Sequence, residues 1–224
     1  MLTRSTPLLN DVRTAIQSEE FKEDLRDFAH YGANIKLEKF VAYALAKSMT
    51  KQGAHCTLEK KKVDLTVNGK SMELKFHYDF DIHWKLPKEL GQIGKADSAP
   101  DTLQDYYDQL NSTAKSKSWE VMFGVLKDVL EKKCDSFLWI ISERDFPTYS
   151  QVFNMESVCF WDAMRVLADQ IPDGTIEEKV RKYFTAPLYK ERRYEMVYET
   201  VTIDKPMITK MHFFFLDFAA STNP

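Results

Sequence analysis

Residues 60–76, KKKVDLTVNGKSMELKF, contain the strongest local structural signal in the chain. Asn68-Gly69 stands between two runs in which apolar and polar residues alternate, a pattern typical of a β-hairpin with a two-residue type I′ turn. Because side chains along a strand point to alternate faces, the register predicts one apolar and one polar face. The apolar face would hold Val63, Leu65, Val67, Met72, Leu74 and Phe76, and the polar face Lys62, Asp64, Thr66, Ser71, Glu73, Lys75 and His77.

The same register brings like charges together on the polar face. Asp64 is expected to face Glu73 directly, and Lys62 to face Lys75, although like charges opposite each other in a sheet are unfavourable. One interpretation is that this face simply meets water. The other is that two carboxylates held about 5 Å apart bind a divalent cation. An apolar strand expected at 136–142 favours the second, because it predicts that the sheet is covered on both sides.

The rest of the chain shows an α/β order of elements. Residues 79–100 are irregular and interrupted by proline and glycine, which predicts a long loop or insertion. Helical patterns cover 8–30, 35–49, 101–110, 119–133, 155–171 and 175–184, the last with Thr175 and Glu178 in capping-box spacing. Strand patterns outside the hairpin cover 54–60, 136–142, 192–203 and 207–218.

The composition indicates a folded protein of ordinary charge. The chain is 44% hydrophobic and 29% charged, which is too apolar for disorder, and its net charge of −3 gives no overall attraction to nucleic acid or membranes. Three widely spaced cysteines favour a reducing compartment. Without an apolar signal segment or an apolar run long enough for a membrane helix, we expect a cytoplasmic protein with no membrane partner.

The hairpin and its neighbours resemble the PD-(D/E)xK nuclease superfamily, also called restriction-endonuclease-like. Asp64 followed by Glu73-Leu74-Lys75 gives D-x8-E-x-K, and the preceding helix carries Glu38. The order over 34–143 matches the family core of helix, three strands, helix and strand. Val63 stands where the family often has proline. The resemblance implies a restriction-endonuclease-like core, with a central mixed β-sheet flanked by helices and an α+β C-terminal extension.

The resemblance also implies a division of the chain. Residues 1–33 would be an N-terminal helical segment and 34–145 the nuclease-like core, with 79–117 as an insertion containing a loop and a helix. Residues 146–224 would add helices and a β-hairpin packed on the same domain.

Carried over residue by residue, the family pattern assigns roles at the hairpin. Asp64 and Glu73 would hold Mg²⁺ or Mn²⁺ together with the backbone carbonyl of Leu74, and Glu38 would contact the metal directly or through water. Lys75 would orient or deprotonate the attacking water, or offset charge on the phosphate. Phosphodiester hydrolysis needs both an activated nucleophile and stabilisation of an anionic transition state, and a hard cation on carboxylates supplies both.

The expected function is therefore that of a metal-dependent nuclease, with DNA rather than RNA as the expected substrate. Endonucleolytic cutting of both strands would suit a homodimer with two active sites. Lysines in the segments around the hairpin are candidate contacts to the nucleic-acid backbone, although exposed lysine is also the commonest loop residue: Lys60, Lys62, Lys85, Lys88, Lys95, Lys115 and Lys117.

Three alternatives stay open from the sequence. The chain could keep the fold as an inactive module that binds nucleic acid or protein. It could also be an unrelated α/β protein whose polar hairpin face is wet. Finally, a continued strand would align His77, Asp79, Asp81 and His83 as a second metal cluster, or as a solvated extension of the strand.

Overall fold

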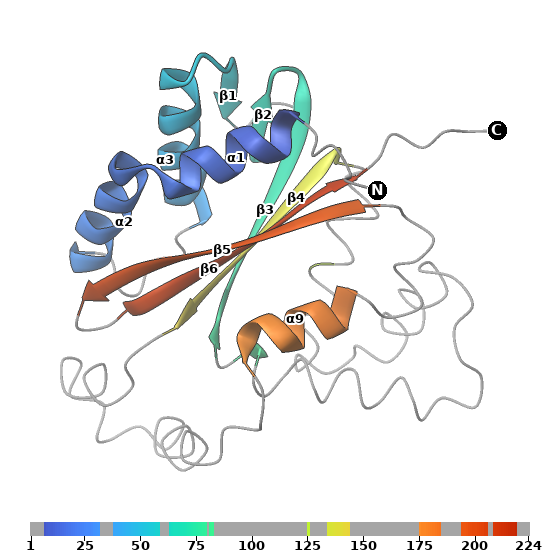
Figure 1. Cartoon of the computed structure of the whole chain (residues 1–224). Helices are drawn as coiled ribbons and strands as arrows, with labels where there is room; N and C mark the ends of the chain where they lie inside the picture. The colour runs from blue at the N-terminus through green and yellow to red at the C-terminus, as the bar shows by residue number, and fades with distance from the viewer. Residues whose placement is uncertain are drawn as a thin grey trace, which may run out of the picture.

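The computed structural model describes residues 7–31, 38–58, 63–79, 81–82, 125, 134–143, 175–184, 194–205 and 208–218. These residues form a six-stranded mixed sheet with helices against both faces (Figure 1). The expected α/β class with a central mixed sheet flanked by helices is confirmed.

Helices α2 (Glu19–Tyr31) and α9 (Ile176–Phe184) begin at residues that cap them. The helical pattern over 8–30 divides at Ser18, whose Oγ accepts a hydrogen bond from the backbone N of Phe21 at 3.3 Å. Thr175 and Glu178 form the predicted capping box, with reciprocal hydrogen bonds of 2.8 and 3.2 Å. The other described helices are α1 (Pro7–Gln17) and α3 (Glu38–Lys51). The helices expected at 101–110, 119–133 and 155–171 lie outside the described residues, apart from Val125.

The strands join segments that are far apart in the sequence. They are β1 (Cys56–Leu58), β2 (Leu65–Val67), β3 (Lys70–Tyr78), β4 (Ser136–Glu143), β5 (Tyr194–Lys205) and β6 (Ile208–Phe218). Their order across the sheet is β1-β2-β3-β4-β6-β5, and β3 and β4 are parallel whereas the other neighbours are antiparallel. The C-terminal hairpin thus extends the same sheet that contains the β2–β3 hairpin.

The β2–β3 turn has the predicted type I′ geometry. Asn68 and Gly69 have φ values of 49° and 85°, both in the left-handed region that this turn requires. Val67 pairs with Lys70 and Leu65 with Met72, as the register predicted. The turn is also tied to the chain just before β1, because the side-chain Oδ1 of Asn68 accepts a hydrogen bond of 2.8 Å from His55 N.

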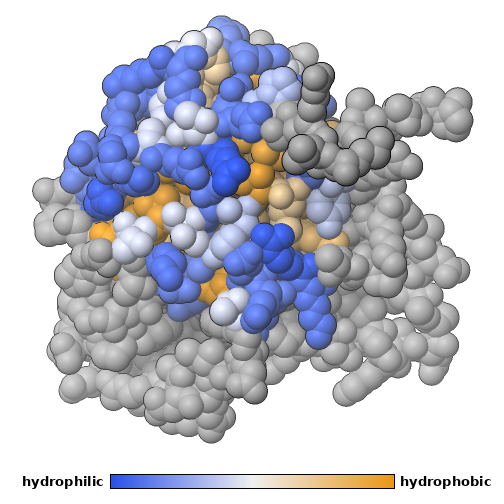
Figure 2. Space-filling model, in the orientation of Figure 1, coloured by the Kyte–Doolittle hydropathy of each residue, from blue (hydrophilic) through white to orange (hydrophobic). Residues whose placement is uncertain are grey.

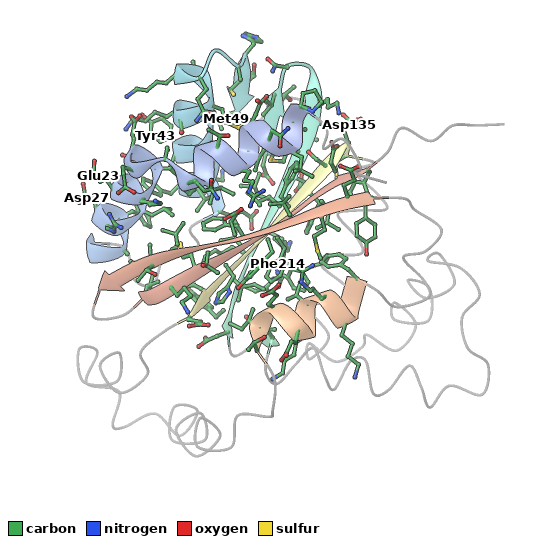
Figure 3. The ribbon with its side chains drawn as sticks, viewed as in Figure 1. Glu23, Asp27, Tyr43, Met49, Asp135 and Phe214 are labelled. Atoms are coloured by element: carbon green, nitrogen blue, oxygen red, sulfur yellow. The ribbon has the colours of Figure 1, made fainter. Side chains whose placement is uncertain are left out.

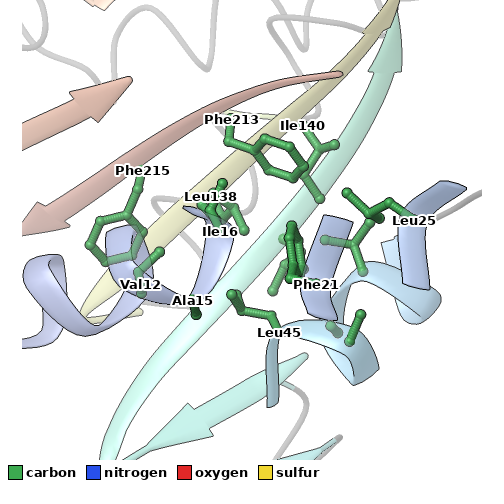
Figure 4. Packing of buried hydrophobic residues seen from close by; sticks show 14 of the residues in the cluster. Val12, Ala15, Ile16, Phe21, Leu25, Leu45, Leu138, Ile140, Phe213 and Phe215 are labelled. Carbon is green, nitrogen blue, oxygen red and sulfur yellow. The ribbon is translucent and has the colours of Figure 1, made fainter. Parts of the chain in front are cut away.

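The apolar core lies between the sheet and the three N-terminal helices. Alternate residues of the central strands point to this side, including Leu138 and Ile140 of β4 (Figure 4). Phe21 of α2 packs edge-on against Phe213 of β6, with 5.7 Å between ring centroids. Hydrophilic side chains predominate where α1 and α2 meet solvent (Figure 2). The period-2 pattern of the strands and the period-3.6 pattern of the helices therefore bury one common layer.

The opposite face of the sheet carries the polar side of β3 and is covered by α9. Trp139 of β4 packs edge-on against Phe184 of α9, with 5.7 Å between centroids, and its indole nitrogen donates a 2.9 Å hydrogen bond to Nδ1 of His77. Because Nδ1 accepts, a neutral His77 ring carries its proton on Nε2. The expectation that the sheet has cover on both sides is confirmed in the described part of the chain.

A second group of hydrogen-bonded side chains lies on this face, between the sheet and α9. Nε2 of His212 lies 2.7 Å from Oε1 of Glu143, and Nδ1 lies 2.8 Å from the hydroxyl of Tyr198. Since a carboxylate only accepts, Nε2 of His212 donates to Glu143. The Tyr198 ring stacks on Phe214, which Figure 3 labels, and Arg181 lies over the Tyr198 ring at 5.9 Å. Burial, followed by the nearby carboxylates of Glu177 and Glu143, raises the pKa of Tyr198 to about 12.

Substituting the turn glycine tests the geometry of the hairpin. A Cβ at Gly69 would meet nothing within 4 Å, so the cost of Gly69→Ala comes from the left-handed φ alone. We expect a loss of about 1 kcal/mol in the free energy of unfolding, measured by urea denaturation. Gly69→Asn is the matched control and should lose less, because asparagine tolerates this region. Equal stability of the alanine variant and wild type would contradict a type I′ turn.

The raised pKa of Tyr198 predicts a loss of stability at alkaline pH. The folded state holds the phenolic proton up to a pKa of about 12, against an ordinary value of 10.0, so this stabilisation is complete below pH 10. It should be lost as pH rises from 10 towards 12. We expect the free energy of unfolding to fall less steeply over this range in Tyr198→Phe than in wild type or Tyr43→Phe. Parallel slopes for all three proteins would contradict the assignment.

Candidate active site

The candidate site lies where strand β3 continues beyond its partner β2. The described ladder between them ends at the Leu65–Met72 pair, whereas β3 continues to Tyr78. Asp64 lies at a bend outside β2 and has no ladder partner. The prediction that Asp64 pairs directly with Glu73 in the ladder is therefore wrong, because β2 is only three residues long and begins at Leu65, after Asp64.

Carboxylates take the place of the missing strand along this edge. The backbone N of Leu74 donates to Oδ2 of Asp64 at 2.8 Å, and the backbone N of Phe76 donates to Oε2 of Glu38 at 3.2 Å. The backbone N of Tyr78 donates to Oδ2 of Asp81, also at 3.2 Å. Alternate amides of a strand point to the same edge, so these carboxylates form a row along β3.

Helix α3 positions Glu38 at this edge. The helix packs on the sheet through apolar residues one turn apart, Val41, Leu45 and Met49, and Glu38 precedes them in its first turn. The partial positive charge at a helix N-terminus favours a carboxylate there. In the helical period of α3, Glu38 borders the apolar stripe, and its carboxylate reaches the β3 backbone from that position.

Glu73 and Lys75 flank the Leu74 amide but direct their side chains to the α9 face. Glu73 is only 1% exposed, and Lys75 is half-buried. Within the described part of the chain, Oε2 of Glu73 is buried and accepts no hydrogen bond, although the residue has other interactions. A buried carboxylate is costly unless a cation or donors offset its charge. Glu73 is thus not a solvated residue, as the wet-hairpin interpretation required.

The oxygen atoms at this edge are of the kind that a hard divalent cation prefers as ligands. Mg²⁺ and Mn²⁺ prefer oxygen ligands, and the carbonyl of Leu74 points to the same edge as its N–H, beside Asp64. However, Asp64 and Glu38 each accept an amide hydrogen here. Among the described residues, no group of three or more His, Cys, Asp or Glu is arranged to hold a metal ion. A cation bound at this edge would share these carboxylates with the backbone amides, and Glu73 would have to reach it from the α9 face.

A cavity opens beside Asp64 on the α3 side of the hairpin. Its volume is about 310 Å³, and its described lining consists of Lys39, Ala42, Leu58 and Asp64. The carboxylate of Asp64 therefore lies between the β3 edge and a space large enough for a small ligand. The sequence did not identify Lys39 or Leu58 as site residues, because their approach depends on how β1 packs against α3.

The second metal cluster is not formed as the extended-strand interpretation required. Strand β3 ends at Tyr78, and Asp81 turns back to accept the amide hydrogen of that residue. His77 is buried and bound to Trp139. His83 lies outside the described residues, as do all the lysines that we expected to contact nucleic acid: Lys60, Lys62, Lys85, Lys88, Lys95, Lys115 and Lys117.

Comparisons with known proteins gave no relative: no family model, no curated protein and no solved structure matches the chain significantly. In the described part of the chain, no helix is both long enough and apolar enough to span a membrane.

Two substitutions separate the hydrogen bond that Asp64 accepts from the negative charge that it carries. Asp64→Ala removes the acceptor for the Leu74 amide and should lower the free energy of unfolding in EDTA by about 1.5 kcal/mol. Asp64→Asn keeps an acceptor oxygen and should lose less than half of that amount. Urea denaturation measures both values. Stabilisation by either substitution would instead mean that repulsion between carboxylates dominates at this edge.

Proposed function

We propose that the chain is a metal-dependent nuclease with a restriction-endonuclease-like core that hydrolyses phosphodiester bonds in DNA. The observation that carries this proposal is the meeting of Asp64 and Glu38 on the backbone of the E-x-K segment. Their carboxylates contact the amides of Leu74 and Phe76, on either side of Lys75. Residues separated by up to 38 positions in the sequence thus converge on the strand where the family pattern puts its catalytic residues.

Each residue would have a distinct role in this reaction. Asp64, Glu73 and the carbonyl of Leu74 would hold Mg²⁺ or Mn²⁺, with Glu38 contacting the ion or its water. When bound, the cation supplies an activated water and offsets charge on the phosphate. Lys75, next along the strand, would contribute a positive charge to the phosphate or orient the attacking water. The α9 face, packed around Trp139, limits the access of bulk water to Glu73 and strengthens these interactions.

The mode of cutting is part of the proposal. We infer an endonuclease that acts as a homodimer, because cutting both strands of a duplex uses two active sites. We expect it to act in the cytoplasm. No membrane partner is expected.

The alternative is an inactive module that keeps the fold and binds nucleic acid or protein. One observation favours it: the hydrogen bonds from Asp64 to Leu74 and from Glu38 to Phe76 complete the edge of β3 without a cation. In such a protein the carboxylates would cap the strand edge and do no chemistry.

Cleavage of supercoiled plasmid and single-stranded DNA tests the nuclease. We expect cleavage with Mg²⁺ or Mn²⁺ that EDTA abolishes, and a loss of roughly 100-fold or more in Lys75→Ala and Asp64→Asn. Asp81→Asn is the matched control for a carboxylate on the same edge, and Lys70→Ala for a lysine on the same strand. Both controls should cleave within about 3-fold of wild type, since neither residue belongs to the proposed cation site.

Binding of Mn²⁺ to the same proteins, measured by calorimetry, separates the two candidate functions. Binding that is lost in Asp64→Asn but kept in Asp81→Asn supports the cation site. If wild type neither cleaves DNA nor binds Mn²⁺, the inactive module is the better explanation.

A further inference from the structure

The cavity beside Asp64 combines features that the proposed nuclease reaction does not use. Lys39 and Ala42 enter it from one side of α3, and Leu58 enters from the end of β1. Ala42 is small and buried, so the helix leaves space there, while Lys39 is exposed. Its described lining thus provides an apolar wall, the lysine Lys39 and, at Asp64, contact with the proposed cation site.

The exposed large apolar side chains of the described residues lie on β1 and α3, two elements that line the cavity. Among the described residues, the exposed large hydrophobic side chains are Tyr43, at 54%, and Leu58, at 39%. Leu58 lines the cavity itself. Tyr43 lies one helical turn after Lys39, so the two side chains are neighbours on the surface of α3. Tyr43 lies on the outer side of that helix (Figure 3). An aromatic ring, a cation and an apolar wall beside a phosphate-cleaving site suit a nucleotide.

The size of the cavity limits the form of the nucleic acid. A volume of about 310 Å³ is at the small end of sites for organic ligands, which suits one nucleotide and excludes a double helix. A base inside a duplex is stacked and paired, so it could enter only after leaving the helix. An unpaired base needs no such step.

We propose that this cavity receives one unpaired nucleotide of the strand that is cut, so that the substrate is single-stranded, or locally unpaired, beside the cleaved bond. The base lies against Leu58 and Ala42, its phosphate lies at Lys39, and the next base stacks on Tyr43. This inference rests on the proposed nuclease function for the position of the cleaved bond. The nucleotide site itself depends only on the cavity.

Binding measurements test the cavity separately from cleavage. Lys75→Ala protein, which keeps the cavity and leaves DNA intact, is titrated into fluorescein-labelled oligothymidylate and into a blunt hairpin duplex of equal length. We expect tighter binding of the single strand, weakened about 5-fold or more by adding Lys39→Ala or Tyr43→Ala. Lys51→Ala, at the far end of the same helix, and Tyr43→Phe, which keeps the ring, should leave the Kd within about 2-fold.

The outcomes distinguish this inference from the proposed function. Equal binding of duplex and single strand, or unchanged binding in both Lys39→Ala and Tyr43→Ala, overturns the nucleotide site, even if wild type cleaves DNA. Tighter binding of the single strand than of the duplex, weakened by these substitutions, supports the nucleotide site. This holds even if wild type cleaves no DNA, and in that case only the nuclease proposal fails. Circular dichroism and urea denaturation of each variant confirm that a loss of binding is not a loss of fold.

Discussion

The early end of the β2 ladder is the constraint on which the rest of the site depends. Because β2 begins only at Leu65, the amides of β3 beyond Met72 on that edge need other acceptors, since a buried backbone N–H without a partner costs free energy. Carboxylates from α3, from the bend before β2 and from the segment after β3 supply them. A requirement of the backbone thus brings acidic side chains from separate parts of the chain to one strand edge. The cavity lies beside this edge, at Asp64.

The local part of this arrangement could be predicted from sequence, because it depends on neighbouring residues. Asn68-Gly69 determined the turn and its register, Thr175 and Glu178 determined a helix start, and alternation along β3 placed Glu73 on the face opposite Met72. These features follow from the conformational preferences of a few residues and from a fixed side-chain period. They hold whatever the distant parts of the chain do.

The long-range part could not be predicted, because it depends on where elements stop and what they pack against. Nothing in the sequence around Val63 indicates that the strand begins only at Leu65, so the pattern placed Asp64 opposite Glu73, whereas Asp64 bonds to the next amide instead. The contact between Glu38 and Phe76 requires the docking of α3 on β3, and the cavity requires the docking of β1 on α3. The continuation from Tyr78 failed as a strand because Asp81 folds back onto that residue.

The position of β6 has a consequence for how the chain folds during synthesis. Strand β6 lies between β4 and β5, so the apolar strand β4 has no partner on that edge until the last described strand has been made. A nascent chain that has emerged only as far as β4 would present an open, almost entirely hydrophobic edge, a known template for association with other chains. Pairing over such a separation is slow to form. The nascent chain would therefore depend on chaperones, or on rapid completion of its C-terminal hairpin, to avoid aggregation.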